Sequence, residues 1–193
     1  APYLAPQGRY LAAQYPLDAK DGRPYWSEYH RDFRASLAAD PARYGKVLVT
    51  AFGKGHYDIA PPGSADLVLT FRNTHNWMQD GYADAAFAAF YRALKPGGLL
   101  GVEGHRGRTD RPQDPQAADG YVREDHAIAL ARKAGFELVA TSEALANPRD
   151  TKDHPAGVWT LPPTLRLGDR DRAKYLAIGE SDKFLLKFRK PAR

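Results

Sequence analysis

Short apolar runs alternate with segments of helical periodicity along this chain, most clearly between Ala65 and Arg106. Residues 67–71 form a continuous apolar run with β-branched members, which predicts a strand buried on both faces. Residues 80–95 repeat aromatic and alanine side chains on one helical face, before a Pro-Gly-Gly sequence that ends a helix. Residues 99–102 form a second apolar run. This stretch therefore predicts a strand–helix–strand unit with parallel strands.

The rest of the chain repeats this alternation on both sides of the unit. Residues 142–181 form a long irregular insertion, with one short helix expected around residues 170–177. The predicted fold is α/β: a three-layer sandwich whose mostly parallel sheet ends in an antiparallel strand, as a single domain over residues 1–193. The other expected strands cover residues 9–13, 47–52, 136–140 and 184–188, and the other expected helices cover residues 27–40 and 122–134.

Composition excludes several classes of protein. The 193 residues contain no apolar run near the ~18 residues of a membrane span, so we expect a soluble protein. The lack of cysteine excludes disulfides, thiolate metal sites and cysteine nucleophiles. The net charge of +5 is spread along the chain, which favours a solvated surface over a nucleic-acid interface. Cytoplasm and periplasm both stay open as the compartment, because a removed signal peptide leaves no trace here.

Polar side chains gather where the predicted strands end, which is where ligands bind in parallel α/β sheets. Arg72, Asn73 and His75 follow the first strand of the unit. His75 is a candidate general base, since an imidazole titrates near neutral pH. The alternative is a polar turn in which Asn76 or Asp80 caps the next helix.

Glu103 and His105 follow the second strand of the unit at alternate positions, so both side chains project from the same face. The pair predicts either a carboxylate that orients an imidazole for proton transfer or a metal-binding pair. The alternative is a surface turn in which His105 bonds to backbone. The remaining histidines lack the spacing of metal ligands, so we expect no metal site among them.

Several stretches resemble a known family. The sequence DLVLTFRNTHNW, followed by FYRALKPGGLLGVE, a helix ending in AGF and a terminal strand, resembles the second half of the class I S-adenosylmethionine-dependent methyltransferases. The runs YVREDHAIALARKAGF and DTKDHPAGVWTLPP are similar to one bacterial group of predicted methyltransferases with undefined substrates. The resemblance covers residues 8–191 and implies a Rossmann-like fold, S-adenosylmethionine as cofactor and a small-molecule substrate.

The resemblance also implies which residues surround a cofactor and a substrate. Arg72, Asn73 and His75 occupy the strand end that faces the transferred methyl group in the family. Gln14 stands where the family usually has an acidic residue for the ribose hydroxyls, and its neutral amide is a weaker partner. Trp77 is a candidate for stacking on adenine, with burial in the core as the alternative. The cofactor side as a whole comprises Gln14, Phe52, Phe71 and Trp77.

One part of the family pattern is missing from the 193 residues. The glycine-rich loop of the form Glu/Asp-x-Gly-x-Gly-x-Gly, expected before the first helix, does not occur. The family's first strand lies in the middle of the sheet, so its absence would expose two apolar strand edges. We expect an N-terminal segment beyond this sequence to fill the gap, with homo-oligomer formation or strand exchange as the alternative.

Two functions remain open. The favoured hypothesis is a methyltransferase that positions a substrate nucleophile for in-line attack and removes its proton. The alternative is a non-catalytic binding or interaction module that keeps the same fold. The missing glycines and the neutral Gln14 favour the module, whereas the polar strand end favours the enzyme. A metal-dependent enzyme built on Glu103 and His105 ranks below both.

Overall fold

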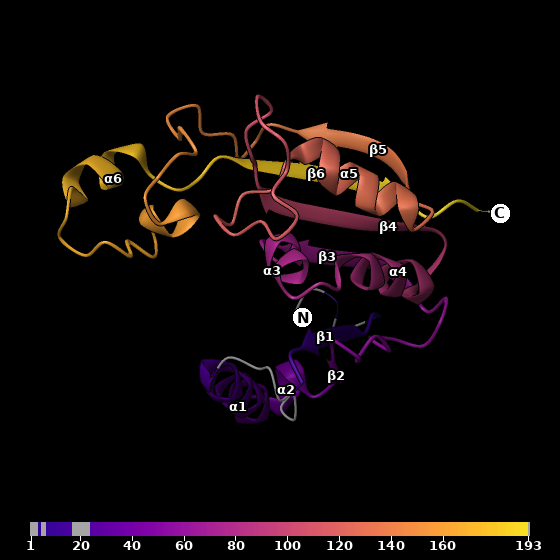
Figure 1. Ribbon diagram of the computed structural model, residues 1–193. Coiled ribbons are helices and arrows are strands. Elements are labelled where there is room, and N and C mark those ends of the chain that lie inside the picture. Colours follow the sequence, from indigo (N-terminus) through magenta and orange to yellow (C-terminus); the bar gives the residue numbers. More distant parts are fainter. Residues whose placement is uncertain (1–3, 5–6, 17–23, 193) are drawn as a thin grey trace.

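Helices and strands alternate along the chain in the computed structural model, which describes residue 4, residues 7–16 and residues 24–192 (Figure 1). This is the predicted α/β class. The strands are β1 (Tyr10–Gln14), β2 (Val47–Ala51), β3 (Ala65–Phe71), β4 (Leu94–His105), β5 (Glu137–Ser142) and β6 (Lys183–Arg189). The helices are α1 (Pro24–Ala39), α2 (Pro41–Tyr44), α3 (Thr74–Gln79), α4 (Ala83–Ala93), α5 (Glu124–Lys133), the 3-10 helix η1 (Gly157–Thr160) and α6 (Arg172–Ile178).

The strands form two sheets. The small sheet pairs β1 with β2, and the large sheet has the order β3-β4-β6-β5. β1 and β2 run parallel, as do β3 and β4, whereas β6 runs antiparallel to both of its neighbours. Within the described ranges no strand lies between β1 and β3, so each keeps an unpaired edge. This order agrees with the expectation that a central strand is missing.

Helices α4 and α5 cover one face of the large sheet. Ala86, Phe87 and Phe90 form the buried face of α4 and share one core cluster with Leu100 of β4 and Phe188 of β6. Aromatic packing is dense there, with the rings of Phe87 and Phe90 5.9 Å apart. The aromatic and alanine side chains that repeat with helical periodicity in residues 80–95 therefore face the core, as expected.

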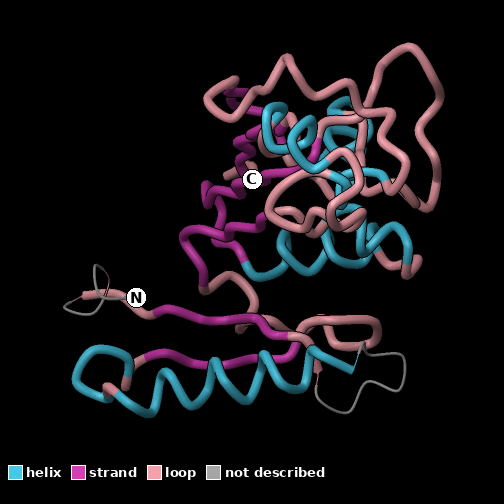
Figure 2. The backbone as a smooth tube through the Cα atoms, turned by 90° about the vertical axis from the view of Figure 1, so that its left-hand side faces the viewer, coloured by secondary structure: helices cyan, strands magenta, loops and turns pink. Residues whose placement is uncertain are grey.

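The other face of the large sheet has no helix over it among the described residues (Figure 2). Leu67, Leu69 and Phe71 lie there, each more than half exposed, beside a shallow apolar groove of about 360 Å³ over all four strands. The prediction that residues 67–71 are buried on both faces is therefore wrong. Alternate residues of a strand face opposite sides, and no described segment covers one side of β3.

The predicted helix over residues 80–95 is also corrected. Gly81 takes a positive φ of 72°, which separates α3 from α4 at a position where glycine is tolerated without strain. α4 ends at Ala93 because Leu94 is already extended and begins β4. The Pro-Gly-Gly sequence thus lies within β4 rather than at the helix end. The predicted short helix of the insertion is confirmed as α6.

Candidate functional site

A strained turn connects β3 to α3 and carries the first predicted site residues. Arg72 has a φ of 56°, a left-handed conformation that costs a non-glycine residue about 1–2 kcal/mol. Its backbone N–H donates to the carbonyl oxygen of Glu103 at 2.9 Å, which ties the end of β3 to β4. Asn73 is the N-cap residue of α3 and makes no side-chain cap bond. Such strain concentrates at functional sites.

The alternative interpretation of this turn, helix capping by Asn76 or Asp80, is wrong. Asn76 lies inside α3, and Asp80 lies at its C-terminal end, where its backbone N–H donates to Asn76. The N-cap residue of the following helix α4 is Tyr82. The polar side chains of this turn therefore have no capping role to explain them.

Two histidines, one from α3 and one from the end of β4, meet beside this turn. The rings of His75, in α3, and His105, at the end of β4, have their centroids 5.5 Å apart. Trp159 of η1 packs edge-on against His75 at 5.7 Å, and Tyr121 packs edge-on against His105 at 6.5 Å. His75 is buried, whereas His105 and Trp159 stay partly exposed. We call His75, His105, Tyr121, Trp159 and Ser181 the histidine cluster.

Burial keeps the His105 imidazole neutral. Its pKa falls from 6.5 to about 3, chiefly through loss of solvent and further through the nearby His75, Lys183 and Arg72. Nδ1 of His105 lies 2.6 Å from Oγ of Ser181, which fixes the plane of the ring. A neutral imidazole with so low a pKa is a weak base, and it is better suited to hydrogen bonding than to proton removal.

Glu103 does not bind His105, the partner predicted from the sequence. Its carboxylate lies 3.9 Å from Nζ of Lys183, which also pairs with Glu180, while His105 binds Ser181. The predicted Glu103–His105 pair is therefore wrong as a contact, although both residues lie on one face of β4. Lys183 stands opposite His105 in the register of β4 and β6, and its charge attracts the carboxylate instead.

The insertion contributes residues that were not among the predicted site residues, although the stretch from Asp150 to Pro163 was a candidate lid or substrate wall. Trp159 is held over the cluster by the guanidinium of Arg166, which lies 4.5 Å from the centre of its ring. Asp150 is buried, and its carboxylate binds Tyr121 and His154. The i, i+4 spacing of Asp150 and His154 was the one signal in the sequence, but nothing in the pattern indicated that Tyr121 would join them.

The residues predicted for a cofactor lie around the ends of β1, β2 and β3. The backbone N–H of Phe52 donates to the carbonyl oxygen of Gln14 at 2.7 Å, so the ends of β1 and β2 are joined. The Phe52 ring packs against Trp77 at 5.5 Å and Phe90 at 5.3 Å. Trp77 is only 4% exposed, as in the core alternative, whereas Phe71 lies on the uncovered face of the sheet. Helix α3 thus carries Trp77 toward Phe52 and His75 toward His105.

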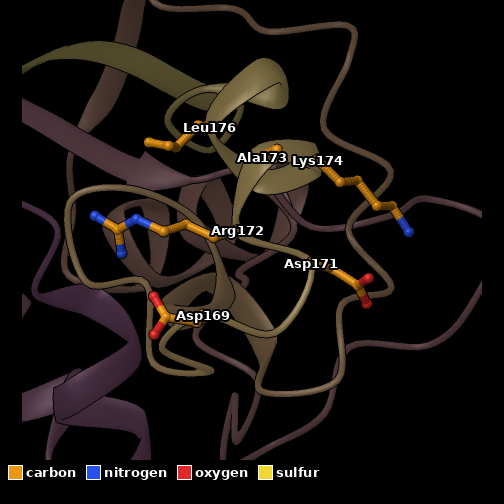
Figure 3. Close-up of a pocket in the computed structure, with 6 residues that line it drawn as sticks. All are labelled: Asp169, Asp171, Arg172, Ala173, Lys174 and Leu176. Atoms are coloured by element: carbon orange, nitrogen blue, oxygen red, sulfur yellow. The ribbon is translucent and has the colours of Figure 1, made fainter.

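Other candidate features lie outside this cluster. Among the described residues no three His, Asp or Glu side chains come together as a metal site. No described helix is both long enough and apolar enough to cross a membrane. A surface hollow beside α6 (Figure 3) involves none of the predicted site residues. Its lining consists of Asp169, Asp171, Arg172, Ala173, Lys174 and Leu176.

We compared the sequence and the structure with those of known proteins, and only the comparison of structures gave matches. No family model matches the sequence, and no curated protein matches it. The [4+2]-cyclase SpnF is similar in structure, with a TM-score of 0.57 and 16% identity over 84% of this chain and 62% of the cyclase. A SAM-dependent methyltransferase from Methanosarcina mazei has a TM-score of 0.53 and 11% identity over 84% of this chain and 77% of that chain.

A third similar structure is a SAM-dependent methyltransferase from Aquifex aeolicus, with a TM-score of 0.50 and 12% identity over 87% of this chain and 65% of that chain. The chain therefore spans less than two thirds of the length of both the cyclase and the Aquifex aeolicus enzyme. At identities this low the structural similarity shows the fold alone, and the named chemistry differs between these proteins. The chain has the fold of the class I S-adenosylmethionine-dependent methyltransferases.

Proposed function

We propose that this protein is an S-adenosylmethionine-dependent methyltransferase acting on a small molecule. The observation that carries the proposal is the histidine cluster at the carboxyl ends of β3 and β4, beside a strained turn. Ligands of this fold class bind at that edge of the sheet, where side chains from several strand ends converge. His75 and His105 supply polar groups that can bind an O–H or N–H nucleophile and accept the proton that it loses on methylation.

The residues at the ends of β1 to β3 fit part of such a cofactor. Gln14 offers an amide that both donates and accepts, which suits ribose hydroxyls. Phe52, supported by Trp77, offers an apolar surface for a purine ring. Near the turn, Thr70 and Thr74 have buried hydroxyls for which the described residues provide no hydrogen-bond partner.

S-adenosylmethionine, when bound, supplies a methyl group that passes to the substrate nucleophile as the carbon–sulfur bond breaks and a neutral thioether forms. His75 receives the proton that an O–H or N–H nucleophile releases. Neutral His105 holds the substrate by a hydrogen bond, with its ring fixed by Ser181. Trp159 forms an apolar wall that limits access of water. The contribution of the protein is mainly to position the two reactants.

The experiment is transfer of labelled methyl groups from S-adenosylmethionine into a small-molecule extract by the purified protein. His75→Asn should lower the rate by about 10²–10⁴-fold, the usual range for loss of a general base. His126→Asn is the matched control, since His126 lies on α5 outside the cluster. Unchanged transfer by His75→Asn would refute the assigned role, and no transfer by the wild-type protein would refute the activity.

The second candidate is a non-catalytic binding module with the same fold. Gln14 in place of an acid favours it, as does the lack of the family's glycine-rich loop in the 193 residues. A binding module would take up S-adenosylmethionine or a substrate without transferring label. The same assay, run with a parallel binding measurement, separates the two candidates.

We also propose that a strand of the same protein, with a helix behind it, completes the sheet between β1 and β3. Among the described residues both strands have an unpaired edge, and the adjoining face exposes Leu67, Leu69 and Phe71. Folded proteins rarely leave such edges and apolar faces open. Light scattering tests this: a monomer for the natural-length protein is expected, whereas a dimer that dissociates on Leu69→Glu substitution would favour strand exchange between copies.

A further inference from the structure

Asp150 is the most heavily hydrogen-bonded acid among the described residues, and it lies in the insertion rather than at a strand end. Its side chain is 0% exposed. Tyr121 donates its hydroxyl to the carboxylate at 3.0 Å, and Nε2 of His154 lies 2.8 Å from it. The backbone N–H groups of Lys152 and Asp182 donate at 2.9 Å and 2.8 Å. These four partners satisfy a charge that would otherwise be costly to bury.

These partners belong to three separate segments of the chain. Tyr121 precedes α5, His154 lies in the insertion, and Asp182 immediately precedes β6. Asp150 therefore joins the insertion to the rest of the domain at one buried point. Lys152 strengthens the junction, because its Nζ lies 2.8 Å from the carboxylate of Asp182.

Two contacts of the His105 ring lead back to Asp150, one directly through Tyr121 and one through the backbone of Asp182, the residue after Ser181. Tyr121, whose hydroxyl binds Asp150, packs its ring against His105. Ser181, whose Oγ lies 2.6 Å from Nδ1 of His105, is the neighbour in sequence of Asp182, whose N–H binds Asp150. One carboxylate thus fixes the two contacts that set the orientation of the imidazole.

We infer that Asp150 is a positioning residue of the proposed methyl-transfer site, which holds His105 in place through Tyr121 and the chain segment before β6. This inference rests on the proposed function for its biological meaning, but the contacts themselves exist without cofactor or substrate. Burial and the charge of Asp150 raise the pKa of Tyr121 well above its usual value, so the tyrosine remains a donor at any working pH.

The test is an NMR titration of the His105 imidazole in the wild-type chain and in Asp150→Asn and Tyr121→Phe. The groups that face His105 and bear on its titration are His75 from α3, Arg72 from the turn and Lys183 from β6. If Asp150 positions the ring, both variants loosen the contacts and admit water, so the pKa of His105 should rise by about 1 unit or more. Hydrogen exchange over residues 143–163 should also accelerate.

The sign of the shift separates positioning from a simple charge effect. Removing a negative charge alone lowers the pKa of a nearby imidazole, and Tyr121→Phe removes no charge. Asp153→Asn is the matched control, because Asp153 is an exposed acid of the same segment whose carboxylate binds Thr151 and makes no contact with Tyr121 or His105 among the described contacts. An unchanged or lowered pKa in both variants would overturn the inference.

The experiment distinguishes a variant that fails to fold from a failure of the inference, and a failure of the inference from a failure of the proposed function. If Asp150→Asn fails to fold, Tyr121→Phe still tests the inference, since it keeps the buried charge and removes only the hydroxyl. The titration uses neither cofactor nor substrate. A raised pKa together with a protein that transfers no methyl group would keep Asp150 as the residue that orients His105 and would refute the methyltransferase proposal instead.

Discussion

Gly157 is the position where a single methyl group should do most damage to the candidate site. It has a φ of 57° and begins η1, the 3-10 helix that carries Trp159. A Cβ atom there would overlap the backbone oxygen of Asp119 and lie 2.7 Å from the Asp119 carbonyl carbon and Cα. Because the obstacle is backbone, it cannot rotate away. Gly157→Ala should therefore displace η1 from the loop before α5.

Gly168 provides a control with nearly the same backbone conformation. Its φ is 61°, but a Cβ atom would meet nothing within 4 Å. Both alanine variants carry the left-handed strain of about 1–2 kcal/mol. Only Gly157→Ala adds overpacking against fixed atoms, which costs about a further 1–3 kcal/mol. The expected difference in the free energy of unfolding between the two variants is therefore about 1–3 kcal/mol.

Urea unfolding followed by circular dichroism measures that difference, and tryptophan fluorescence reports whether Trp159 leaves its site. Gly157→Ala should lower the midpoint further than Gly168→Ala, with altered fluorescence in the native state. Equal destabilisation of the two variants within about 0.5 kcal/mol, with unchanged fluorescence, would refute the close packing of η1 on Asp119, since differences of that size are typical of surface substitutions.

Two further predictions concern the core and the dependence of stability on pH. In the 193-residue chain Phe87→Ala should cost about 3–5 kcal/mol in urea unfolding, because the ring is fully buried, whereas Phe71→Ala on the uncovered face should cost less than about 1 kcal/mol. Similar costs would contradict the assignment of the two faces. The pKa of His105 is lowered to about 3 in the folded protein, so below pH 6.5 the unfolded chain binds the extra proton. Stability should therefore fall by about 1.4 kcal/mol per pH unit between pH 6 and pH 4 from this group alone, and His105→Asn should remove that part of the slope. A slope unchanged by His105→Asn would show that the imidazole is not buried in its neutral form.

The sequence predicted the fold well because the fold depends on local periodicity. The apolar run at residues 67–71 and the helical face before β4 identify their elements without reference to the rest of the chain. The end of α4 was misplaced because Leu94 pairs with β3, a contact between distant residues that overrides the local stop signal. The exposure of Leu67 was not predictable, since a strand pattern does not say whether a layer covers it.

The candidate site was predicted in part. His75 and His105 follow neighbouring strands, so the topology brings them together, as the rule for strand ends requires. Trp159 and Asp150 come from an insertion without periodicity, and their contacts with His75 and Tyr121 span about 30 to 80 positions in sequence. Rules based on residue spacing describe contacts within one helix or strand, so they cannot predict contacts between residues this far apart in sequence.

Calorimetric titration of the purified protein with S-adenosylmethionine tests the central claim most directly. The account predicts saturable binding of one molecule per chain. Gln14→Ala should weaken it by about 2- to 12-fold, the value of one hydrogen bond. Gln116→Ala, which changes an exposed glutamine outside the site, should leave it unchanged. A folded protein that releases no heat of binding would contradict the account and leave a methyltransferase fold without its cofactor.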